Sequence, residues 1–583
     1  MAFHRQDNVL RVRANRTMSS RFETIPELVD FAALTYEGKT ALQMRRGGRF
    51  FQITFQELKS RSECAAAGLI ALGTSSTDRI AILSENRPEW AVAYLATLRA
   101  GCTAVPLCPQ LKTHELRHII SIVKSEYLFA SATFLEQASE VTEGFPFFKG
   151  VISLDGESEL TLADLIVKGE DARSLPAMPS PDDLAVLIFT SGTTGKAKGV
   201  MLSHKNIVSD VMSVYEGLSY GSADNLISVL PLYHTFEATC GMLAPLAKGA
   251  SVTYARSIKP TEIVKDIQDS GATIMLCVPL LYEKLLAGIH RGLKKAPARD
   301  RAVFRVAWSV SKGLEHLRVN PGRMLFRSLR KRAGLRTLRL MICGGAPLSP
   351  EVGLAFRRLG FTFLEGYGLT EASAVVAVDR QGKERPGSVG PALPGIDLRI
   401  DNPDEHGVGE IAIRGDNVML GYFEDPEETA KTVRGGWLRT GDLGRLDKRG
   451  YLYITGRTKN LIVTKAGKNV YPEEIEEELQ KSDFVKEVLV VGRTDPQSKR
   501  ERTHAIVHPD YEMIDADGEL KGMTYAREDV ETLIGEEVKR CNESLADYKK
   551  IKQFELREEE FPKTATGKIK RYLFQEKALH IRS

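Results

Sequence analysis

The stretch Thr190-Ser191-Gly192-Thr193-Thr194-Gly195-Lys196-Ala197-Lys198-Gly199 directly follows a strand-like apolar run, Leu184 to Phe189. Its glycines let backbone amides approach a phosphate chain, its hydroxyls can donate to phosphate oxygens, and its lysines supply positive charge. It is not a Walker loop, because two residues rather than four separate its first glycine from the Gly-Lys pair and no hydroxyl residue follows that lysine. The stretch predicts a phosphate-binding loop after a strand. The alternative is a flexible surface loop, since these residue types are common in turns.

The flanking sequence alternates helical and strand-like segments. A capping box at residues 54–57 opens a helix that runs to about residue 72, residues 79–83 are strand-like, Pro88 begins a helix that ends near Gly101, and residues 102–107 are again strand-like. Such alternation predicts a mainly parallel sheet covered by helices. Short strands between Gly, Pro and Asp over residues 387–453 predict a β-rich layer, and charged helices alternate with strands after Gly456. We expect a domain boundary there, separating residues 1–456 from 457–583.

The composition is that of a globular protein with more than one domain. The chain has 583 residues and a net charge of +4, which indicates no particular partner. Its seven cysteines form no CxxC pair and predict reduced, buried thiols in a cytoplasmic protein. The N-terminal segment is charged and lacks the apolar core of a secretory signal, and no apolar run reaches 18 residues, so we expect neither a signal nor a membrane span.

Further motifs follow the glycine-rich run in a fixed order. They are Gly344-Gly345-Ala346-Pro347, Gly366-Tyr367-Gly368-Leu369-Thr370-Glu371, Trp437-Leu438-Arg439-Thr440-Gly441-Asp442, Gly456-Arg457-Thr458-Lys459 and Pro562-Lys563-Thr564-Ala565-Thr566-Gly567-Lys568-Ile569. From about residue 25 onward the ordered set resembles the AMP-forming acyl-CoA synthetase, adenylation-domain and luciferase superfamily. The resemblance implies an α/β fold, with a large N-terminal adenylate-forming domain of parallel sheets plus a β-rich subdomain, and a small mobile α+β C-terminal domain.

The superfamily's chemistry accounts for the residue types. A carboxylate attacks the α-phosphate of ATP to give acyl-AMP and pyrophosphate, and a thiol then displaces AMP; the first step brings an anion towards a polyanion and so needs cations and positioning more than a base. The resemblance implies a nucleotide site around Tyr367 as the adenine platform, Thr370 at the α-phosphate, Glu371 as the Mg²⁺ ligand and Asp442 at the ribose. The remaining implied nucleotide-binding residues are Thr190, Ser191, Gly192, Thr193, Thr194, Gly195, Lys198, Gly344, Gly345, Ala346, Gly368 and Arg457.

Plainer explanations exist for the same residues. Tyr367 could be a core tyrosine, Glu371 a charge in the first turn of a helix, and Asp442 a turn-capping residue. Lys568 could be a solvated lysine, but its Lys-Thr-x-x-Gly-Lys context resembles the family's catalytic lysine motif.

Two orientations of the C-terminal domain are implied by the resemblance. Lys459 matches the hinge position, one orientation would present Lys568 for adenylation, and the other would present the loop around Gly467, which in the family lines the channel for coenzyme A. The sequence ends twelve residues after Arg571 without a carrier domain, and the segment from Arg457 to the start of the next helix is short. Both features favour CoA as acceptor, and a separate carrier protein is the alternative.

Two features favour a fatty acid as substrate. Pro231-Leu232-Tyr233-His234-Thr235-Phe236-Glu237 resembles a segment of long-chain fatty acyl-CoA synthetases, in which the histidine lies near the acyl entrance; a structurally satisfied histidine is the alternative. Residues 291–339 carry 15 Lys and Arg against two acids, and long-chain enzymes resemble this chain in having a basic helical insertion there. The basic stretch predicts peripheral contact with the anionic inner face of a membrane, with a solvated helix face as the alternative.

These observations predict an ATP- and Mg²⁺-dependent ligase that joins a medium- to long-chain fatty acid to coenzyme A. Alternatives are an aryl- or other carboxylate–CoA ligase, a stand-alone adenylating enzyme that serves a carrier protein, and a lipid- or nucleotide-binding protein with a silent site. Nucleic-acid binding is not expected, because the basic stretch has neither an aromatic platform nor a reading helix.

Overall fold

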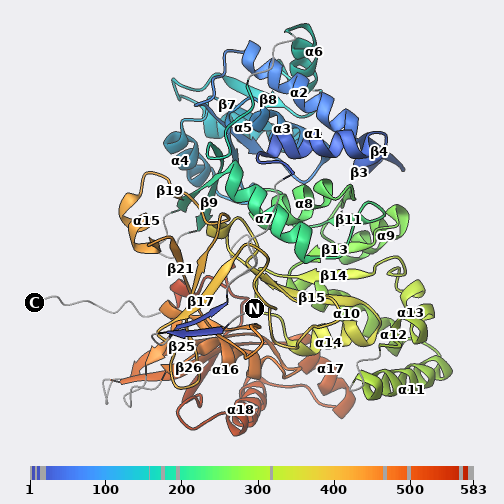
Figure 1. Ribbon diagram of the computed structural model, residues 1–583. Helices are drawn as coiled ribbons and strands as arrows, with labels where there is room; N and C mark the ends of the chain where they lie inside the picture. The colour runs from blue at the N-terminus through green and yellow to red at the C-terminus, as the bar shows by residue number, and fades with distance from the viewer. Residues whose placement is uncertain are drawn as a thin grey trace, which may run out of the picture.

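The computed structural model describes residues 3–6, 9–12, 21–156, 158–172, 177–191, 197–315, 320–463, 469–495, 500–563 and 569–574. It is a mixed α/β structure in which sheets are stacked along the length of the molecule, with helices α1 to α6 at one end and the C-terminal segment at the other (Figure 1). The predicted fold class, with a large N-terminal domain and a smaller C-terminal domain, is confirmed.

The first sheet has the strand order β19-β10-β9-β6-β5-β7-β8. The strands from β9 to β8 are parallel, whereas β10 runs antiparallel to both β9 and β19. Strands β6 and β7 are buried throughout, as expected for parallel strands covered on both faces. The bounds are β5 Arg79–Leu83, β6 Thr103–Pro106, β7 Tyr127–Ala130, β8 Gly150–Ser153, β9 Leu184–Ser191, β10 Ala197–Ser203 and β19 Gly421–Tyr422.

Helices α1 to α6 cover this sheet and its neighbour. The sequence predicted α2 from its capping box, and Thr54 indeed accepts from the Glu57 amide while the Glu57 carboxylate accepts from the Thr54 amide. The bounds are α1 Ile25–Tyr36, α2 Phe55–Ala71, α3 Pro88–Arg99, α4 Thr113–Val123, α5 Leu135–Thr142 and α6 Leu162–Ala172.

The second sheet has the order β16-β15-β14-β13-β11-β12-β3-β4, and its strands from β15 to β3 are parallel. The strands are β3 Thr40–Arg46, β4 Arg49–Thr54, β11 Asn225–Ser228, β12 Ser251–Tyr254, β13 Ile274–Cys277, β14 Leu340–Cys343, β15 Thr362–Tyr367 and β16 Ala377–Val378. The helices that follow these strands are α9 Pro260–Ser270, α10 Pro279–Lys294, α11 Ala298–Glu315, α12 Gly322–Leu325, α13 Arg327–Arg332 and α14 Pro350–Arg358.

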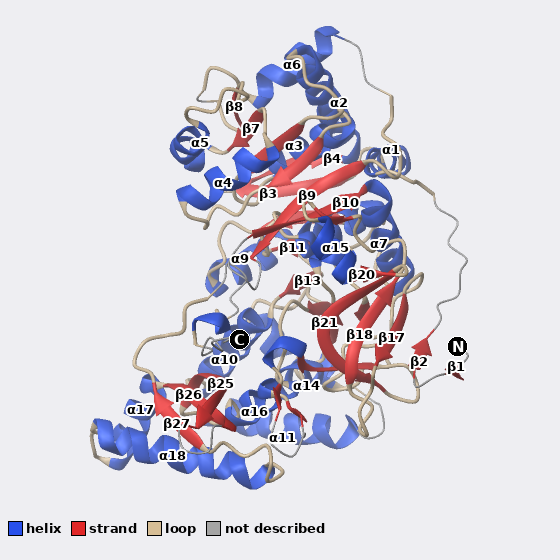
Figure 2. Cartoon of the chain, turned by 90° about the vertical axis from the view of Figure 1, so that its left-hand side faces the viewer, coloured by secondary structure: helices blue, strands red, loops and turns tan. Residues whose placement is uncertain are grey.

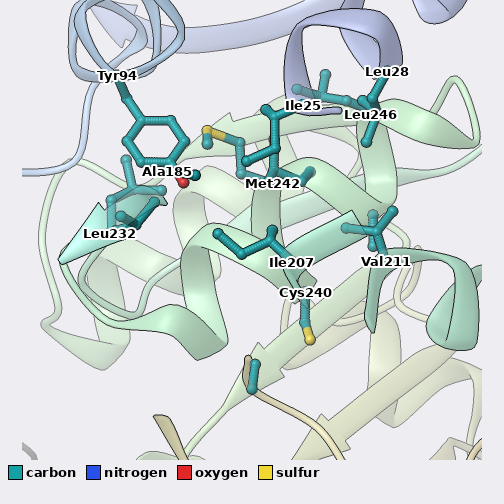
Figure 3. Close-up of a cluster of buried hydrophobic side chains, with 14 of the residues drawn as sticks. Ile25, Leu28, Tyr94, Ala185, Ile207, Val211, Leu232, Cys240, Met242 and Leu246 are labelled. Carbon is teal, nitrogen blue, oxygen red and sulfur yellow. The ribbon is translucent and has the colours of Figure 1, made fainter. Parts of the chain in front are cut away.

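A central helical layer joins the two mixed sheets into one core. Helix α7 (His204–Gly217), the π-helix η2 (Phe236–Leu243) and helix α8 (Ala244–Ala247) contribute side chains to a buried cluster that also contains residues of both sheets. Figure 3 shows Ile207 and Val211 of α7 beside Met242 of η2 and Leu246 of α8, with the Cys240 side chain pointing away from Met242. The core is therefore continuous between the sheets, and η2 lies inside it.

The β-rich layer predicted over residues 387–453 is a third, antiparallel sheet with the order β1-β2-β17-β18-β21-β20 and β22 paired to β21 (Figure 2). The N-terminal hairpin β1–β2 adds to its edge by pairing with β17, which the sequence did not predict. The bounds are β1 Phe3–Gln6, β2 Val9–Val12, β17 Asp397–Asp401, β18 Gly409–Arg414, β20 Val433–Arg434, β21 Trp437–Leu446 and β22 Leu452–Arg457. Helix α15 spans Pro426–Thr432.

The C-terminal segment has its own buried cluster, built by strands β25 and β26 and helices α16 to α18. A smaller cluster links it to the third sheet, because Leu461 and Tyr471 pack with Val408 and Leu443. The bounds are β23 Ile462–Val463, β24 Asn469–Val470, α16 Pro472–Leu479, β25 Val485–Asp495, β26 Arg500–Pro509, α17 Tyr511–Lys521, α18 Arg527–Ser544 and β27 Gln553–Leu556.

The cysteines differ in part from the expectation of buried thiols. Cys102, Cys240, Cys277, Cys343 and Cys541 are buried, but Cys64 and Cys108 are half-buried, because the helix and the loop that carry them lie at the edge of the core.

Candidate active site

The glycine-rich stretch connects strands β9 and β10, which pair antiparallel. Thr190 and Lys198 are register partners in this pair, and the Thr190 hydroxyl lies 3.5 Å from the Lys198 carbonyl oxygen. The predicted strand before the stretch is confirmed. The predicted residues Gly192, Thr193, Thr194 and Gly195 lie outside the described residues, and Ser191 is described for its backbone alone.

Lys198 stands in a chain of charged and polar contacts. Its Nζ forms an ion pair of 2.6 Å with Glu428 Oε1 of α15 and lies 5.0 Å from the centre of the Tyr422 ring. The Tyr422 hydroxyl in turn donates to Glu371 Oε1 at 2.9 Å. Burial, the nearby Glu371 charge and the hydrogen bond to it raise the pKa of Tyr422 above its ordinary value, so the tyrosine remains a donor. Tyr422 thus connects the predicted phosphate-binding lysine to the predicted metal ligand.

Thr370 and Glu371 lie in the short 3₁₀ turn η3 (Thr370–Ala372), directly after β15. Ser373 and Ala374, which follow the turn, have positive φ values of 60° and 132°, conformations that non-glycine residues rarely adopt. The backbone at Gly368 is packed so closely that a Cβ there would lie 1.7 Å from the Ala374 carbonyl oxygen. These contacts hold the turn in one place, which fixes the Glu371 carboxylate.

The residue types at this turn fit Mg²⁺. The ion takes oxygen ligands and is commonly held by one or two carboxylates together with substrate phosphates. Glu371 supplies a half-buried carboxylate that Tyr422 connects to Lys198, and in the described ranges no three His, Cys, Asp or Glu side chains form a metal-binding group. Glu371 therefore suits an ion that arrives with phosphate oxygens rather than one enclosed by protein ligands.

Tyr367, Asp442 and Arg457 form a second connected group. The Tyr367 hydroxyl donates to Asp442 Oδ2 at 2.7 Å, and Arg457 Nε lies 2.8 Å from Asp442 Oδ1. Strand pairing brings the last two together, because Asp442 of β21 and Arg457 of β22 are register partners. Burial raises the pKa of Tyr367 well above its ordinary value, and the Asp442 charge raises it further. Both carboxylate oxygens of Asp442 are thus hydrogen-bonded or ion-paired.

The Gly-Gly-Ala segment follows β14, and the aromatic ring of Phe236 packs against its first glycine. A Cβ on Gly344 would lie 2.9 Å from Phe236 Cζ, and Gly345 has a φ of +85°, so side chains are excluded at both positions. Ala346 is half-buried beside them. Phe236 also lines an apolar cavity between α7, η2 and the second sheet, together with Val214, Cys240, Leu276, Ile342 and Val375. The segment predicted to contact adenine and this cavity therefore share one side chain as a wall.

His234 immediately precedes η2, and its ring lies 4.4 Å from that of Tyr233. Its carbonyl oxygen accepts from the amides of Glu237 and Ala238, which begins the π-helix. The structure thus places His234 at the N-terminal end of η2, two residues before the Phe236 side chain that lines the cavity. Whether it contacts an acyl group stays a prediction.

Lys459 is exposed in the 3₁₀ turn η4 (Thr458–Asn460), between β22 and the C-terminal cluster. The hinge role of Lys459 stays a prediction. Lys568 and Gly467 lie outside the described residues, and their roles remain predictions.

Sequence reasoning missed Tyr422 and Glu428. Neither belongs to a motif that was singled out, and both meet Lys198 from residues more than two hundred positions away. Nothing in the local sequence around Tyr422 or at the acidic start of α15 indicated that these residues contact the glycine-rich stretch.

Comparison with known proteins places this geometry in a family. A model of the AMP-binding enzymes matches residues 29–423, and one of their C-terminal domain matches residues 474–568. The chain is 31% identical to 3-[(3aS,4S,7aS)-7a-methyl-1,5-dioxo-octahydro-1H-inden-4-yl]propanoyl:CoA ligase of Rhodococcus jostii, over 90% of this chain and 94% of that protein. It is 30% identical to the long-chain-fatty-acid–CoA ligase FadD15 of Mycobacterium tuberculosis, over 81% of this chain and 82% of that protein.

The fold agrees with solved structures. ATP-bound MatB from Rhodopseudomonas palustris has a TM-score of 0.73 at 27% identity, with 94% of this chain and 98% of that chain covered. The anthranilate CoA ligase AuaEII in complex with anthranoyl-AMP has a TM-score of 0.74 at 22% identity, over 94% of this chain and 96% of that chain, and shows the fold alone. The chain belongs to the AMP-binding enzymes, and within them to the adenylate-forming acid–CoA ligases.

Proposed function

We propose that this ligase activates a medium- to long-chain fatty acid as its acyl-adenylate and transfers the acyl group to coenzyme A. The observation that carries the proposal is the shared wall, Phe236, between the glycine segment at residues 344–346 and a cavity lined by apolar side chains. The cavity has a volume of about 20 Å³ and is too small for a whole acyl chain, but apolar side chains beside a nucleotide site favour acids with an apolar body. The similarity to fatty acid–CoA ligases at about 30% identity supports the same class.

In the proposed reaction, residues of the described groups bind and orient ATP. Lys198 and the glycine-rich stretch would hold the β- and γ-phosphates, and Tyr367 would stack on adenine. The ribose hydroxyls would bind Asp442 in place of Tyr367 and Arg457. Glu371 would hold Mg²⁺, which neutralises phosphate charge when it is bound. Thr370, at the start of η3, would contact the α-phosphate.

The C-terminal segment, residues 457–583, would complete the site in two orientations. We propose that it pivots at Lys459, brings Lys568 to the reacting oxygens for adenylation, and brings the loop at Gly467 to the site for thioester formation. Its separate buried cluster supports motion as a unit.

Acid specificity is tested directly by release of AMP and pyrophosphate with ATP, Mg²⁺ and CoA. A rate that rises from acetate through octanoate to palmitate and oleate is expected. Activity confined to benzoate or coumarate would instead support the second candidate, a ring-acid–CoA ligase. That candidate is favoured by the 29% identity to feruloyl-CoA synthase of Amycolatopsis over 91% of this chain.

We further propose that the basic surface at residues 291–339 contacts an anionic membrane. On α11 the apolar side chains of Val303, Val306 and Val310 are 61%, 65% and 43% exposed, and Met324 of α12 is 77% exposed. Arginines and lysines surround them, so the surface offers both an apolar stripe and positive charge, each basic residue contributing about 1 kcal/mol near anionic lipid. Among the described residues no helix is long and apolar enough to cross a bilayer.

Co-sedimentation with vesicles checks this contact. Wild-type protein should pellet with vesicles containing phosphatidylserine and less with neutral ones, and Val306→Asp should weaken pelleting. Leu520→Asp is the matched control, because Leu520 is 87% exposed on α17 in the C-terminal segment. Equal pelleting with both lipid compositions would exclude the electrostatic contact.

A further inference from the structure

Strand β19 forms one edge of the first sheet (Figure 1) and belongs to a short segment that bonds to two parts of the candidate nucleotide site. The Phe423 amide donates to the carbonyl oxygen of Gly199, the residue after Lys198 on β10, at 2.7 Å. The Met419 amide donates to the Glu371 carbonyl oxygen at 2.9 Å. One segment therefore holds the backbone beside the predicted phosphate-binding lysine and that of the predicted metal ligand.

Side chains strengthen the connection to η3. The Asn417 side-chain amide donates to the Ala372 carbonyl oxygen at 3.1 Å, and the Ser373 hydroxyl donates to the Asn417 carbonyl oxygen at 2.8 Å. Asn417 and Ser373 are both buried, so these hydrogen bonds lie in a medium of low dielectric, where they are stronger than in water. The segment at residues 417–423 is thus tied to η3 at several points.

Helix α15 holds the backbone of Tyr422. The Tyr422 amide donates to Thr429 Oγ1 at 2.8 Å. Gly421 has a φ of +148°, and a Cβ there would lie 2.6 Å from Thr429 Cγ2, so a side chain is excluded at this position. The close approach of β19 and α15 therefore fixes where the Tyr422 side chain begins.

The Tyr422 side chain is buried and contacts both functional groups. Its hydroxyl donates to Glu371 Oε1 at 2.9 Å, and Lys198 Nζ lies 5.0 Å from the centre of its ring. The terminal torsion of a glutamate is broad, so an unrestrained carboxylate presents its oxygens over a range of directions. A hydrogen bond to one oxygen narrows that range and leaves the other oxygen oriented.

A hydroxyl orients Glu371 without cancelling its charge. In the part of the chain that the structure describes, no lysine or arginine forms an ion pair with the Glu371 carboxylate. The negative charge therefore remains available to a cation that binds together with phosphate oxygens. A lysine or arginine in place of Tyr422 would compete with that cation.

We propose that Tyr422 is a positioning residue of the nucleotide site: its hydroxyl orients Glu371 toward Mg²⁺, and its ring places Lys198 beside the phosphates of the same nucleotide. The inference rests on the proposed function, which assigns these roles to Glu371 and Lys198. It adds that the two contacts are coupled through one side chain. Removal of a group that orients a metal ligand typically lowers metal affinity about 10- to 100-fold.

Nucleotide binding without turnover tests the coupling. The dissociation constant of α,β-methylene-ATP is measured by calorimetry with saturating Mg²⁺ and with EDTA, in the absence of acid and CoA. The constant in EDTA divided by the constant in Mg²⁺ defines the Mg²⁺ gain. Tyr422→Phe removes the hydroxyl and keeps the ring, so the Mg²⁺ gain should fall about ten-fold while the constant in EDTA changes less than about two-fold. Tyr422→Leu also removes the ring and should weaken binding in EDTA about two- to five-fold.

Glu371→Gln provides the reference for the hydroxyl. It should lower the Mg²⁺ gain at least as far as Tyr422→Phe does. The double variant should lose no more than Glu371→Gln alone, because the hydroxyl acts through this carboxylate. Tyr525→Phe is the matched control, since the Tyr525 hydroxyl also donates to a carboxylate, Asp517 Oδ2 at 2.6 Å, but lies in the C-terminal segment. It should leave both constants unchanged.

Two results would overturn the inference while Glu371 keeps its role. One is an unchanged Mg²⁺ gain in Tyr422→Phe. The other is an equal loss of affinity in Mg²⁺ and in EDTA, which would indicate a structural defect rather than a misplaced metal ligand. Full additivity of the two single losses in the double variant would likewise contradict an action of Tyr422 through Glu371.

Failure of the proposed function has a different signature. If Glu371→Gln leaves the Mg²⁺ gain unchanged, the role of Glu371 in the proposed function is wrong and the inference falls with it. If Glu371→Gln abolishes the gain and Tyr422→Phe does not lower it, the inference alone fails. The choice of acid affects neither result, because no acid is present in the measurement.

Discussion

The polar side chains of the candidate nucleotide site and the carboxyls buried on α7 and η2 are partnered in opposite ways. At the nucleotide site they hold one another: Lys198 pairs with Glu428, and Asp442 pairs with both Tyr367 and Arg457. On α7 and η2, Asp210 Oδ1 and both carboxyl oxygens of Glu237 have no hydrogen-bond partner among the described residues. A ligand at the nucleotide site must therefore displace internal partners, whereas the two buried carboxyls have few partners to lose.

The difference follows from solvent access. Lys198, Glu428 and Arg457 are partly exposed, so their ion pairs exchange readily for phosphate or ribose contacts. Asp210 and Glu237 are buried, and burial raises the pKa of both carboxyls above the ordinary range. Exposure thus lets the charges of the nucleotide site exchange partners, whereas burial favours the neutral form of the two carboxyls.

The largest expected effect on activity is at Lys568, which belongs neither to the nucleotide-site residues nor to the buried carboxyls compared above. Lys568→Ala should lose about 10²–10³-fold in ATP–pyrophosphate exchange, the scale of one missing electrostatic donor. Thioester formation from preformed acyl-AMP should largely survive, because the proposed second orientation does not use this lysine. Equal loss in both half-reactions would contradict the two-orientation proposal.

Asp442→Asn breaks the paired group on the nucleotide side. The amide cannot accept from Arg457 and Tyr367 as the carboxylate does, and it weakens the bonds to the ribose hydroxyls. We expect KM for ATP to rise about 10–10²-fold with a smaller change in kcat, on the scale of hydrogen bonds to a charged group. Asp401→Asn, on β17 of the same sheet, is the control, and an equal effect there would indicate a general structural defect.

Glu237→Gln tests the buried carboxyl of Glu237 through the pH dependence of the free energy of unfolding. The Glu237 pKa is about 8 in the folded protein and near 4.5 in the unfolded chain, so between these values the folded state binds more protons. The free energy of unfolding should therefore fall as pH rises from about 4.5 to 8, by up to a few kcal/mol, and then level off. Glutamine should remove that part of the slope, measured by denaturant unfolding across pH. An unchanged slope would mean that Glu237 is ionised in the folded protein.

The smallest expected effect is at Glu428. Glu428→Gln removes the partner that ATP phosphates must displace from Lys198, so KM for ATP should fall about two- to five-fold, the range of a partly exposed ion pair. The gain should shrink at high salt. Glu427→Gln, the preceding position on α15, serves as control. A rise in KM would show that Glu428 helps to bind the nucleotide.

Local patterns predicted much of the architecture because their physical causes are local. The capping box of α2, the strand before the glycine-rich stretch and the start of α3 at Pro88 were each readable from a few adjacent residues. The hairpin β1–β2 was not, because its pairing with β17 joins residues nearly four hundred positions apart. Tyr422 was missed for the same reason, since its role depends on two distant side chains meeting at one ring.

The sequence by itself determined the family, the fold class and the list of candidate site residues, because ordered motifs encode backbone shape and charge at short range. Only the tertiary structure decided which of these residues are paired. Asp442 meets Arg457 through strand register, and Lys198 of β10 meets Glu428 of α15. The tertiary structure alone showed that Asp210 and Glu237 are buried with carboxyl oxygens that have no hydrogen-bond partner among the described residues. Burial and hydrogen bonding belong to the three-dimensional environment of a side chain, which no stretch of adjacent residues specifies.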